Sequence, residues 1–99
     1  MYALGQGVTQ DYAEAVKWFR RAADQGLAQA QTKLGAMYSM GDGVTQDYVI
    51  AHMWFNIAAA SGNANAEKGR DMAAKQMTRA QIAEAQKMAR EWVAKHRSQ

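Results

Sequence analysis

The sequence predicts an all-α fold, a short α/α superhelical solenoid built from antiparallel helix pairs. Two observations predict it: 21 of the 99 residues are alanine while none is proline, and a long segment recurs after 36 residues. Alanine is the best helix former, and without proline long helices continue uninterrupted. A repeat period of roughly 30–40 residues with helical patterning is typical of stacked helix pairs.

The repeat becomes visible when the chain is shifted by 36 positions. Sixteen of the 29 residues from 2 to 30 are then identical to their counterparts, and the segment 2–12 falls on the segment 38–48. The match continues beyond that segment through the pairs Ala15/Ala51, Trp18/Trp54, Phe19/Phe55 and Gly26/Gly62.

Each copy contains a helix with one apolar side. Within residues 47–61 the apolar residues recur at spacings of three and four, which places them on one helix face: Tyr48, Ala51, Trp54, Phe55, Ala58 and Ala59. Asp47 is suited to cap this helix, and Asp11 with Glu14 forms a capping-box pattern in the earlier copy. Gly62 and Gly26 suit left-handed C-terminal caps.

Another helix is predicted for residues 28–40, with an apolar side that contains Ala30, Leu34, Met37 and Tyr38. Gly35 lies beside this side, although glycine in a helix interior costs about 1 kcal/mol relative to alanine. We therefore expect Gly35 to permit a close approach of Ala51 or Ala58 on the next helix. Because the glycine-rich link 41–46 is short, the two helices should form an αα-hairpin.

These residues resemble the Sel1-like repeat, a relative of the tetratricopeptide repeat. The matching residues are Ala30, Leu34, Gly35, Tyr38, Gly41, Gly43, Val44, Asp47, Tyr48, Ala51, Trp54, Ala58, Ala59 and Gly62. The pattern is present again from 2 to 26 without its first helix. The resemblance implies an α/α superhelix that serves as a protein-interaction scaffold or adaptor, often in bacterial proteins.

The chain is expected to form a single repeat domain, 1–99. Residues 1–27 would be a partial first repeat that lacks most of its first helix, residues 28–62 a complete repeat, and residues 63–99 a degenerate repeat with a C-terminal capping helix. Residues 1–5 would be the tail of the missing helix. In the degenerate repeat we expect a helix over about 63–76. Four residues would lie on its inner side: Ala66, Gly69, Met72 and Ala73.

The capping helix is predicted to begin after Thr78, which forms a capping box with Gln81. One side of this helix is apolar and the other is charged, as the terminal element of a solenoid requires. The apolar side holds Ile82, Ala85, Ala89, Trp92 and His96.

The helix over residues 11–25 has no hairpin partner in this sequence. Part of its apolar side should therefore face water, and an exposed apolar patch usually marks a contact surface. A two-fold interface needs one self-complementary patch, so we expect a homodimer; a truncated chain and a different partner are the alternatives. The residues of this patch are Tyr12, Ala15, Trp18, Phe19 and Ala22.

The resemblance also implies a concave face formed by the first helix of each pair, where a protein or peptide partner would bind. The predicted face is a shallow, mildly basic groove for an extended or helical peptide; ordinary solvent-facing residues are the alternative interpretation. Its residues are Gln29, Thr32, Lys33, Ala36, Ser39, Met40, Asn65, Lys68, Met72 and Lys75.

Several chemical sites find no support in the sequence. Without cysteine there is no disulfide, thiolate zinc site or cysteine nucleophile. His52 and His96 match no metal-ligand spacing, and His52 is expected at the border of its helix. We expect no enzyme, no metal and no cofactor. The alternative is small-molecule binding or β-lactam hydrolysis, as the resemblance to the cysteine-rich branch of the family implies, although this chain lacks those cysteines.

The large apolar side chains have predicted places in the core. We expect the three tryptophans, Trp18, Trp54 and Trp92, to be core residues, because aromatic side chains dominate core burial. Four of the methionines are expected to fill gaps in the core: Met37, Met53, Met72 and Met77.

Charge is unevenly distributed: residues 1–67 carry a net charge of −2 and residues 68–99 a net charge of +5. The basic segment favours a solvated helix face, with binding of an anionic polymer as the alternative and no nucleic acid expected. No apolar stretch reaches the roughly 18 residues needed to span a membrane, and no signal peptide is visible. A complete chain would be cytoplasmic; a piece of a longer precursor would be periplasmic or secreted.

Overall fold

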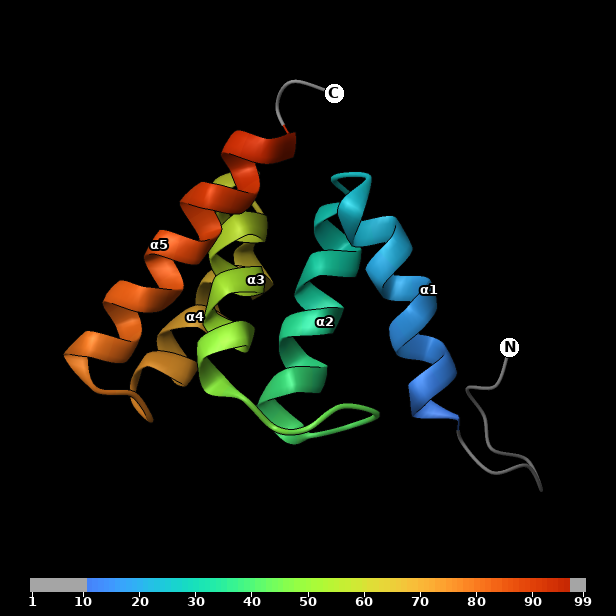
Figure 1. The fold of residues 1–99 in the computed structure, drawn as a ribbon, viewed down its shortest axis with the longest axis horizontal. Coiled ribbons are helices and arrows are strands. Elements are labelled where there is room, and N and C mark those ends of the chain that lie inside the picture. Colours follow the sequence, from blue (N-terminus) through green and yellow to red (C-terminus); the bar gives the residue numbers. More distant parts are fainter. Residues whose placement is uncertain (1–10, 97–99) are drawn as a thin grey trace.

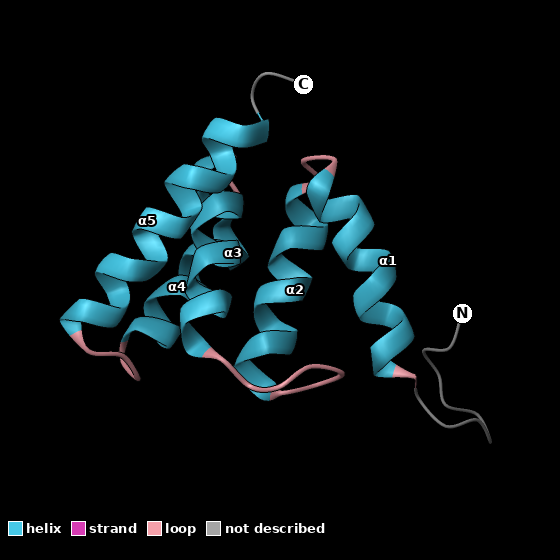
Figure 2. Cartoon of the chain, in the orientation of Figure 1, coloured by secondary structure: helices cyan, strands magenta, loops and turns pink. Residues whose placement is uncertain are grey.

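The computed structural model describes residues 11–96 and contains five helices in that part of the chain, with no strand among the described residues (Figure 2). The helices are α1 (Tyr12–Asp24), α2 (Ala28–Met40), α3 (Tyr48–Ala60), α4 (Ala64–Ala74) and α5 (Arg79–His96). Successive helices are antiparallel and are joined by short turns, which confirms the predicted all-α solenoid of helix pairs. The predicted helix tail at residues 1–5 lies outside the described residues.

The central element is α3, which packs against α2, α4 and α5 (Figure 1). At one edge of the molecule, α1 packs on α2. The helices α2 and α4 run in the same direction and contact each other, so the first helices of two consecutive pairs form one layer. This layer is the surface that the sequence predicts as the concave face.

The helix ends follow the predicted capping residues. Asp47 Oδ1 accepts hydrogen bonds from the backbone amides of Val49 and Ile50, at 2.9 and 3.1 Å. At the start of α5, the backbone amide of Gln81 donates to Thr78 Oγ1 (3.1 Å) and the amide of Thr78 donates to Gln81 Oε1 (2.9 Å), which completes the capping box. These side chains satisfy amides that the helices leave unpaired.

The ring of Phe55 lies between two glycines on neighbouring helices. A Cβ atom added to Gly35 of α2 would lie 2.7 Å from the ring, and one added to Gly69 of α4 would lie 2.6 Å from it. The predicted close approach at Gly35 is therefore real, but its partner is Phe55 and not Ala51 or Ala58. An alanine side chain is too short to fill the space that a glycine leaves, whereas an aromatic ring fills it.

The core has two parts that meet along α3. One contains Leu34, Trp54 and Ile57, and the other centres on Phe55 with small residues from α3 and α4. Trp92 is half-buried and meets Trp54 edge-on, with ring centroids 5.7 Å apart. Alanines between these large side chains, including Ala23, Ala51, Ala58, Ala66 and Ala85, are fully buried and let the helices approach closely.

Three expectations about burial are wrong. His52 was expected at a helix border but is only 3% exposed, because α3 is covered by three helices. Trp18 is predicted both as a core residue and as part of the exposed side of the unpartnered helix; it is 59% exposed, because α1 packs mainly on one neighbouring helix, α2, so the core prediction is wrong. Met72 was expected to turn inward and fill a gap but is 66% exposed; Met37 and Met53 are buried as predicted.

The Phe55 contact generates a prediction for Gly69→Ala. Alanine is more favourable than glycine in a helix by about 1 kcal/mol of folding free energy. The added methyl group also overpacks the buried ring, which typically costs about 1–3 kcal/mol of stability. We expect a lower Tm in thermal unfolding followed by circular dichroism. In a Phe55→Leu background the same substitution should be less destabilising, because the ring is gone. Equal effects in both backgrounds would contradict the contact.

Candidate functional site

The layer formed by α2 and α4 contains two hollows. The first has a volume of about 570 Å³ and lies at the N-terminal ends of these helices, beside the end of α1. The second, of about 380 Å³, lies farther along the same two helices, with residues of α3 beneath it. Because Ala36 lines both hollows, they adjoin along α2, and the two together are called the groove below.

Most of the predicted concave-face residues line this groove. The first hollow includes Gln29, Thr32, Lys33, Ala36 and Asn65. The second includes Ala36, Ser39, Met40 and Met72. Lys68, on α4, and Lys75, which directly follows α4, are exposed but line neither hollow.

Some groove residues were not predicted. Tyr48 and Phe55 line the second hollow, and Phe19 and Ala22 line the first. The repeat pattern had assigned Tyr48 and Phe55 to the core, and Phe55 is indeed only 5% exposed. Glycine at positions 35 and 69 is the signal in the sequence that allows this ring to reach between α2 and α4.

The second hollow is mainly apolar. Its rim carries Met40 and Met72, each 66% exposed, and Tyr48 and Phe55 line it from α3. Ala36, which has a small side chain, lines this hollow as well as the first. Exposed methionines can adapt to partners of different shapes, so this hollow suits an apolar side chain of a binding partner.

Among residues 11–96, the side chains that line the groove carry no negative charge. None of the residues that line either hollow is acidic, and Lys33 is basic. Asn65 lines the groove from α4. Because each residue advances about 100° around a helix, Glu67 lies about 200° from Asn65, on the side of α4 that faces away from the groove. Asp71 Oδ1 lies 3.4 Å from Nε of Arg70. The surroundings of the groove are therefore mildly basic, as the sequence predicts.

The outer side of α1 is partly exposed. Tyr12 is 44% and Trp18 59% exposed, whereas Ala15, Phe19 and Ala22 are half-buried. The guanidinium of Arg21 lies over the Trp18 ring, 5.2 Å from its centroid. The predicted self-association residues thus divide into an exposed aromatic pair and three residues that also pack inward.

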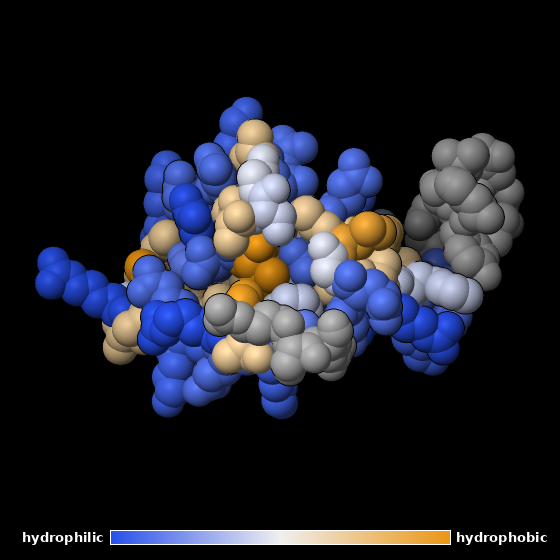
Figure 3. Space-filling model, turned by 90° about the horizontal axis from the view of Figure 1, so that it is seen from above, coloured by the Kyte–Doolittle hydropathy of each residue, from blue (hydrophilic) through white to orange (hydrophobic). Residues whose placement is uncertain are grey.

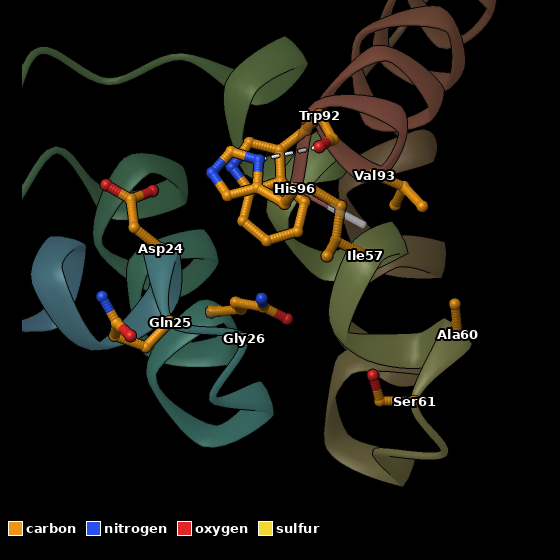
Figure 4. A pocket seen from close by; sticks show the side chains of 10 residues that line it. Asp24, Gln25, Gly26, Ile57, Ala60, Ser61, Trp92, Val93 and His96 are labelled. Carbon is orange, nitrogen blue, oxygen red and sulfur yellow. Dashed lines mark hydrogen bonds between the residues drawn. The ribbon is translucent and has the colours of Figure 1, made fainter. Parts of the chain in front are cut away.

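A third hollow of about 450 Å³ lies at the end of the molecule where α1, α3 and α5 terminate (Figure 4). The His96 ring stacks on Trp92, with centroids 3.8 Å apart, and its Nδ1 lies 2.8 Å from the backbone oxygen of Trp92. Seen from this end, apolar surface fills the middle and hydrophilic residues surround it (Figure 3). Gln31 lines this hollow and donates from Nε2 to the backbone oxygen of Ala23.

Within residues 11–96, no cluster of three or more histidine or acidic side chains is arranged to hold a metal ion. Among the described helices none has the length and apolar character that crossing a membrane requires. Burial lowers the pKa of the His52 imidazole below 6.5, Arg70 lowers it further, and Asp71 opposes the shift. This histidine is therefore neutral near pH 7 and is enclosed in the protein.

Comparisons with known proteins agree with the repeat. The family model described as Sel1 repeat matches residues 1–27 and again residues 28–63. A similar solved structure is that of c5321, described as a protective antigen present in uropathogenic Escherichia coli strains and displaying an SLR fold. The two are 36% identical with a TM-score of 0.86, over 93% of this chain and 20% of that chain. This chain therefore spans about a fifth of that protein. Curated proteins yield no match.

The buried His52 predicts how stability depends on pH. Because its pKa is lowered on folding, the unfolded state binds more protons below the ordinary pKa of 6.5. The contribution of neutral His52 is fully present above pH 6.5 and is lost as the pH falls through the folded pKa. Urea unfolding between pH 5 and 7.5 should show this loss, and His52→Leu should reduce it. An unchanged pH profile in His52→Leu would contradict the assignment.

Proposed function

The chain belongs to the Sel1 repeat family, and on that premise we propose that it is a non-catalytic interaction module that binds a protein or peptide segment in the α2–α4 groove. Proteins with Sel1 repeats and the SLR fold commonly serve as protein-interaction scaffolds and are generally not catalytic. The observation that carries the proposal is the groove of two adjoining hollows, apolar at one end and with no acidic side chain among the described residues that line it.

The groove is supported by rigid elements. Its walls are two helices held at a close distance by the Phe55 ring, which contacts the glycines of both. A surface whose shape is set before binding loses little conformational entropy when a partner docks. The exposed Met40 and Met72 provide apolar area that a partner can bury.

We further infer that the outer side of α1 binds a second copy of the chain. Trp18 corresponds to Trp54 in the repeat, yet Trp54 is 1% exposed and Trp18 is 59% exposed. Tyr12, Trp18 and Arg21 are of the residue types that dominate binding energy at protein interfaces. Two copies related by a two-fold axis would cover these side chains with the same patch of the partner.

Binding in the groove can be tested with a random peptide library displayed on phage. Peptides selected on the chain should lose binding to Ala36→Arg, because the long charged side chain fills the junction of the two hollows. Ala83→Arg is the matched control on the exposed side of α5 and should bind normally. Peptides that bind Ala36→Arg as well as the unmodified chain would contradict the proposed groove.

Self-association can be tested by light scattering against the chain mass of 10.9 kDa. We expect twice that mass at high micromolar concentration, and Trp18→Glu should return the protein to the mass of a monomer because it places a charge in an apolar interface. Ala13→Glu, exposed on the same helix, should remain a dimer. A monomer at all concentrations would refute the dimer and leave the groove proposal unaffected.

A further inference from the structure

The two hollows of the groove differ in chemistry, and this difference indicates which kind of segment binds. The second hollow is apolar, with Met40 and Met72 at its rim and Phe55 beneath. Its volume of about 380 Å³ lies at the low end of the range of roughly 300–1,000 Å³ for ligand pockets. That size suits one large side chain with its adjacent backbone, and a whole helix would not fit inside.

The methionines define how selective this hollow is. Met40 and Met72 are equally exposed, at 66%, and come from different helices on the two sides of the groove. Methionine has an unbranched, flexible side chain that fills irregular spaces. The hollow should therefore accept leucine, methionine or phenylalanine, and reject charged or small polar side chains that would leave the apolar rim uncovered.

Two exposed lysines precede this hollow, one on each helix, whereas Lys75 lies at its other end beside Gln76. Lys33 precedes Ala36 by three residues on α2, and Lys68 precedes Met72 by four residues on α4, so each lysine is about one helical turn before the hollow. The helices α2 and α4 run in the same direction (Figure 1), and each lysine precedes a residue that lines the hollow, so both lysines are on its N-terminal side. The N-termini of both helices lie at that end too and add positive potential.

The first hollow lies at this basic end. It contains Lys33 together with the amide side chains of Gln29, Asn63 and Asn65, and none of the described residues that line it is acidic. The hydroxyl of Thr32 donates to the backbone oxygen of Ala28 at 2.9 Å, so its proton is used within α2. The remaining donors toward a ligand are the ammonium of Lys33 and the NH2 groups of the three amides, which are suited to a carboxylate.

The spacing between the hollows sets the spacing in the ligand. On α2 the first hollow is lined around residue 32 and the second around residue 38, which corresponds to about 9 Å at 1.5 Å per residue. In the polyproline II conformation an extended peptide advances about 3.1 Å per residue with three residues per turn, so side chains three residues apart point to the same side. Two side chains about three residues apart can therefore occupy both hollows simultaneously.

We propose that the groove recognises an extended peptide with one large apolar residue and an acidic residue about three positions away. The apolar side chain enters the hollow between Met40 and Met72, and the carboxylate faces Lys33 in the first hollow, with Lys68 exposed outside it, one helical turn after Asn65 on α4. This inference rests on the proposed function and specifies its partner: an acidic segment with a single apolar anchor.

The test uses three acetylated, amidated heptapeptides and the chain with ¹³C-labelled methionine methyl groups. The first peptide has the sequence Ser-Asp-Asp-Ser-Ser-Leu-Ser, the second replaces Leu by Ser, and the third replaces both Asp by Lys. Nuclear magnetic resonance titrations follow the methyl signals of Met40 and Met72. The methyl group of Met88, which lines a different hollow on α5, serves as the internal control.

We expect the first peptide to shift the Met40 and Met72 signals and to leave Met88 unchanged. Loss of the leucine should weaken binding by about tenfold or more, since the burial of its side chain is lost and the apolar rim of the hollow stays in water. Replacing both aspartates should weaken binding by about two- to fivefold for each lost charge pair, an effect that added salt reduces. The charge-reversed variant Lys33→Glu/Lys68→Glu should reverse the preference and bind the lysine peptide better; circular dichroism verifies that it folds.

Three results would overturn the inference: no shift of either methyl group at millimolar peptide, equal binding without the leucine, or equal binding of the acidic and basic peptides. The proposed function would survive each of these if phage selection still yields peptides whose binding requires Ala36. If selection yields no such peptide, the groove proposal itself fails.

Discussion

The arrangement of the helices depends on one aromatic ring held between two backbones. Phe55 projects from α3 between α2 and α4, and at both contacts the neighbouring residue is glycine, where a Cβ atom would lie within 2.7 Å of the ring. This contact sets the distance between the first helices of two consecutive pairs. Packing of this density leaves little freedom for either helix to shift, so the layer that they form is a stable surface.

The groove follows from this packing. Because Phe55 is inserted from below, α2 and α4 lie side by side with a hollow above the ring, and Ala36 also lines the hollow at the helix N-termini. The same layer determines what the groove can bind, since its apolar and basic ends are set by residues on rigid helices. The remaining elements support this layer: α3 fills its underside, α5 covers α3, and α1 packs against α2.

The predictions from sequence were most accurate where local chemistry determines the outcome. The bounds of α2 and the caps at Asp47 and Thr78 depend on residues within one turn, and they agree with the structure. Burial of His52 and exposure of Trp18 and Met72 depend on how many helices surround each position, which helical spacing does not reveal. The concave residues of α2 could be predicted from the repeat, whereas the contribution of Phe55 needed the contact with Gly69, where the repeat is degenerate.

The most direct test of the Phe55 contact is a nuclear Overhauser measurement between its ring protons and the α-protons of Gly35 and Gly69. The structure predicts strong cross-peaks to both glycines, together with ring-current shifts of both sets of α-protons. Cross-peaks to one glycine alone, or to neither, would show that the ring does not join the two helices, and the account of the groove would be wrong.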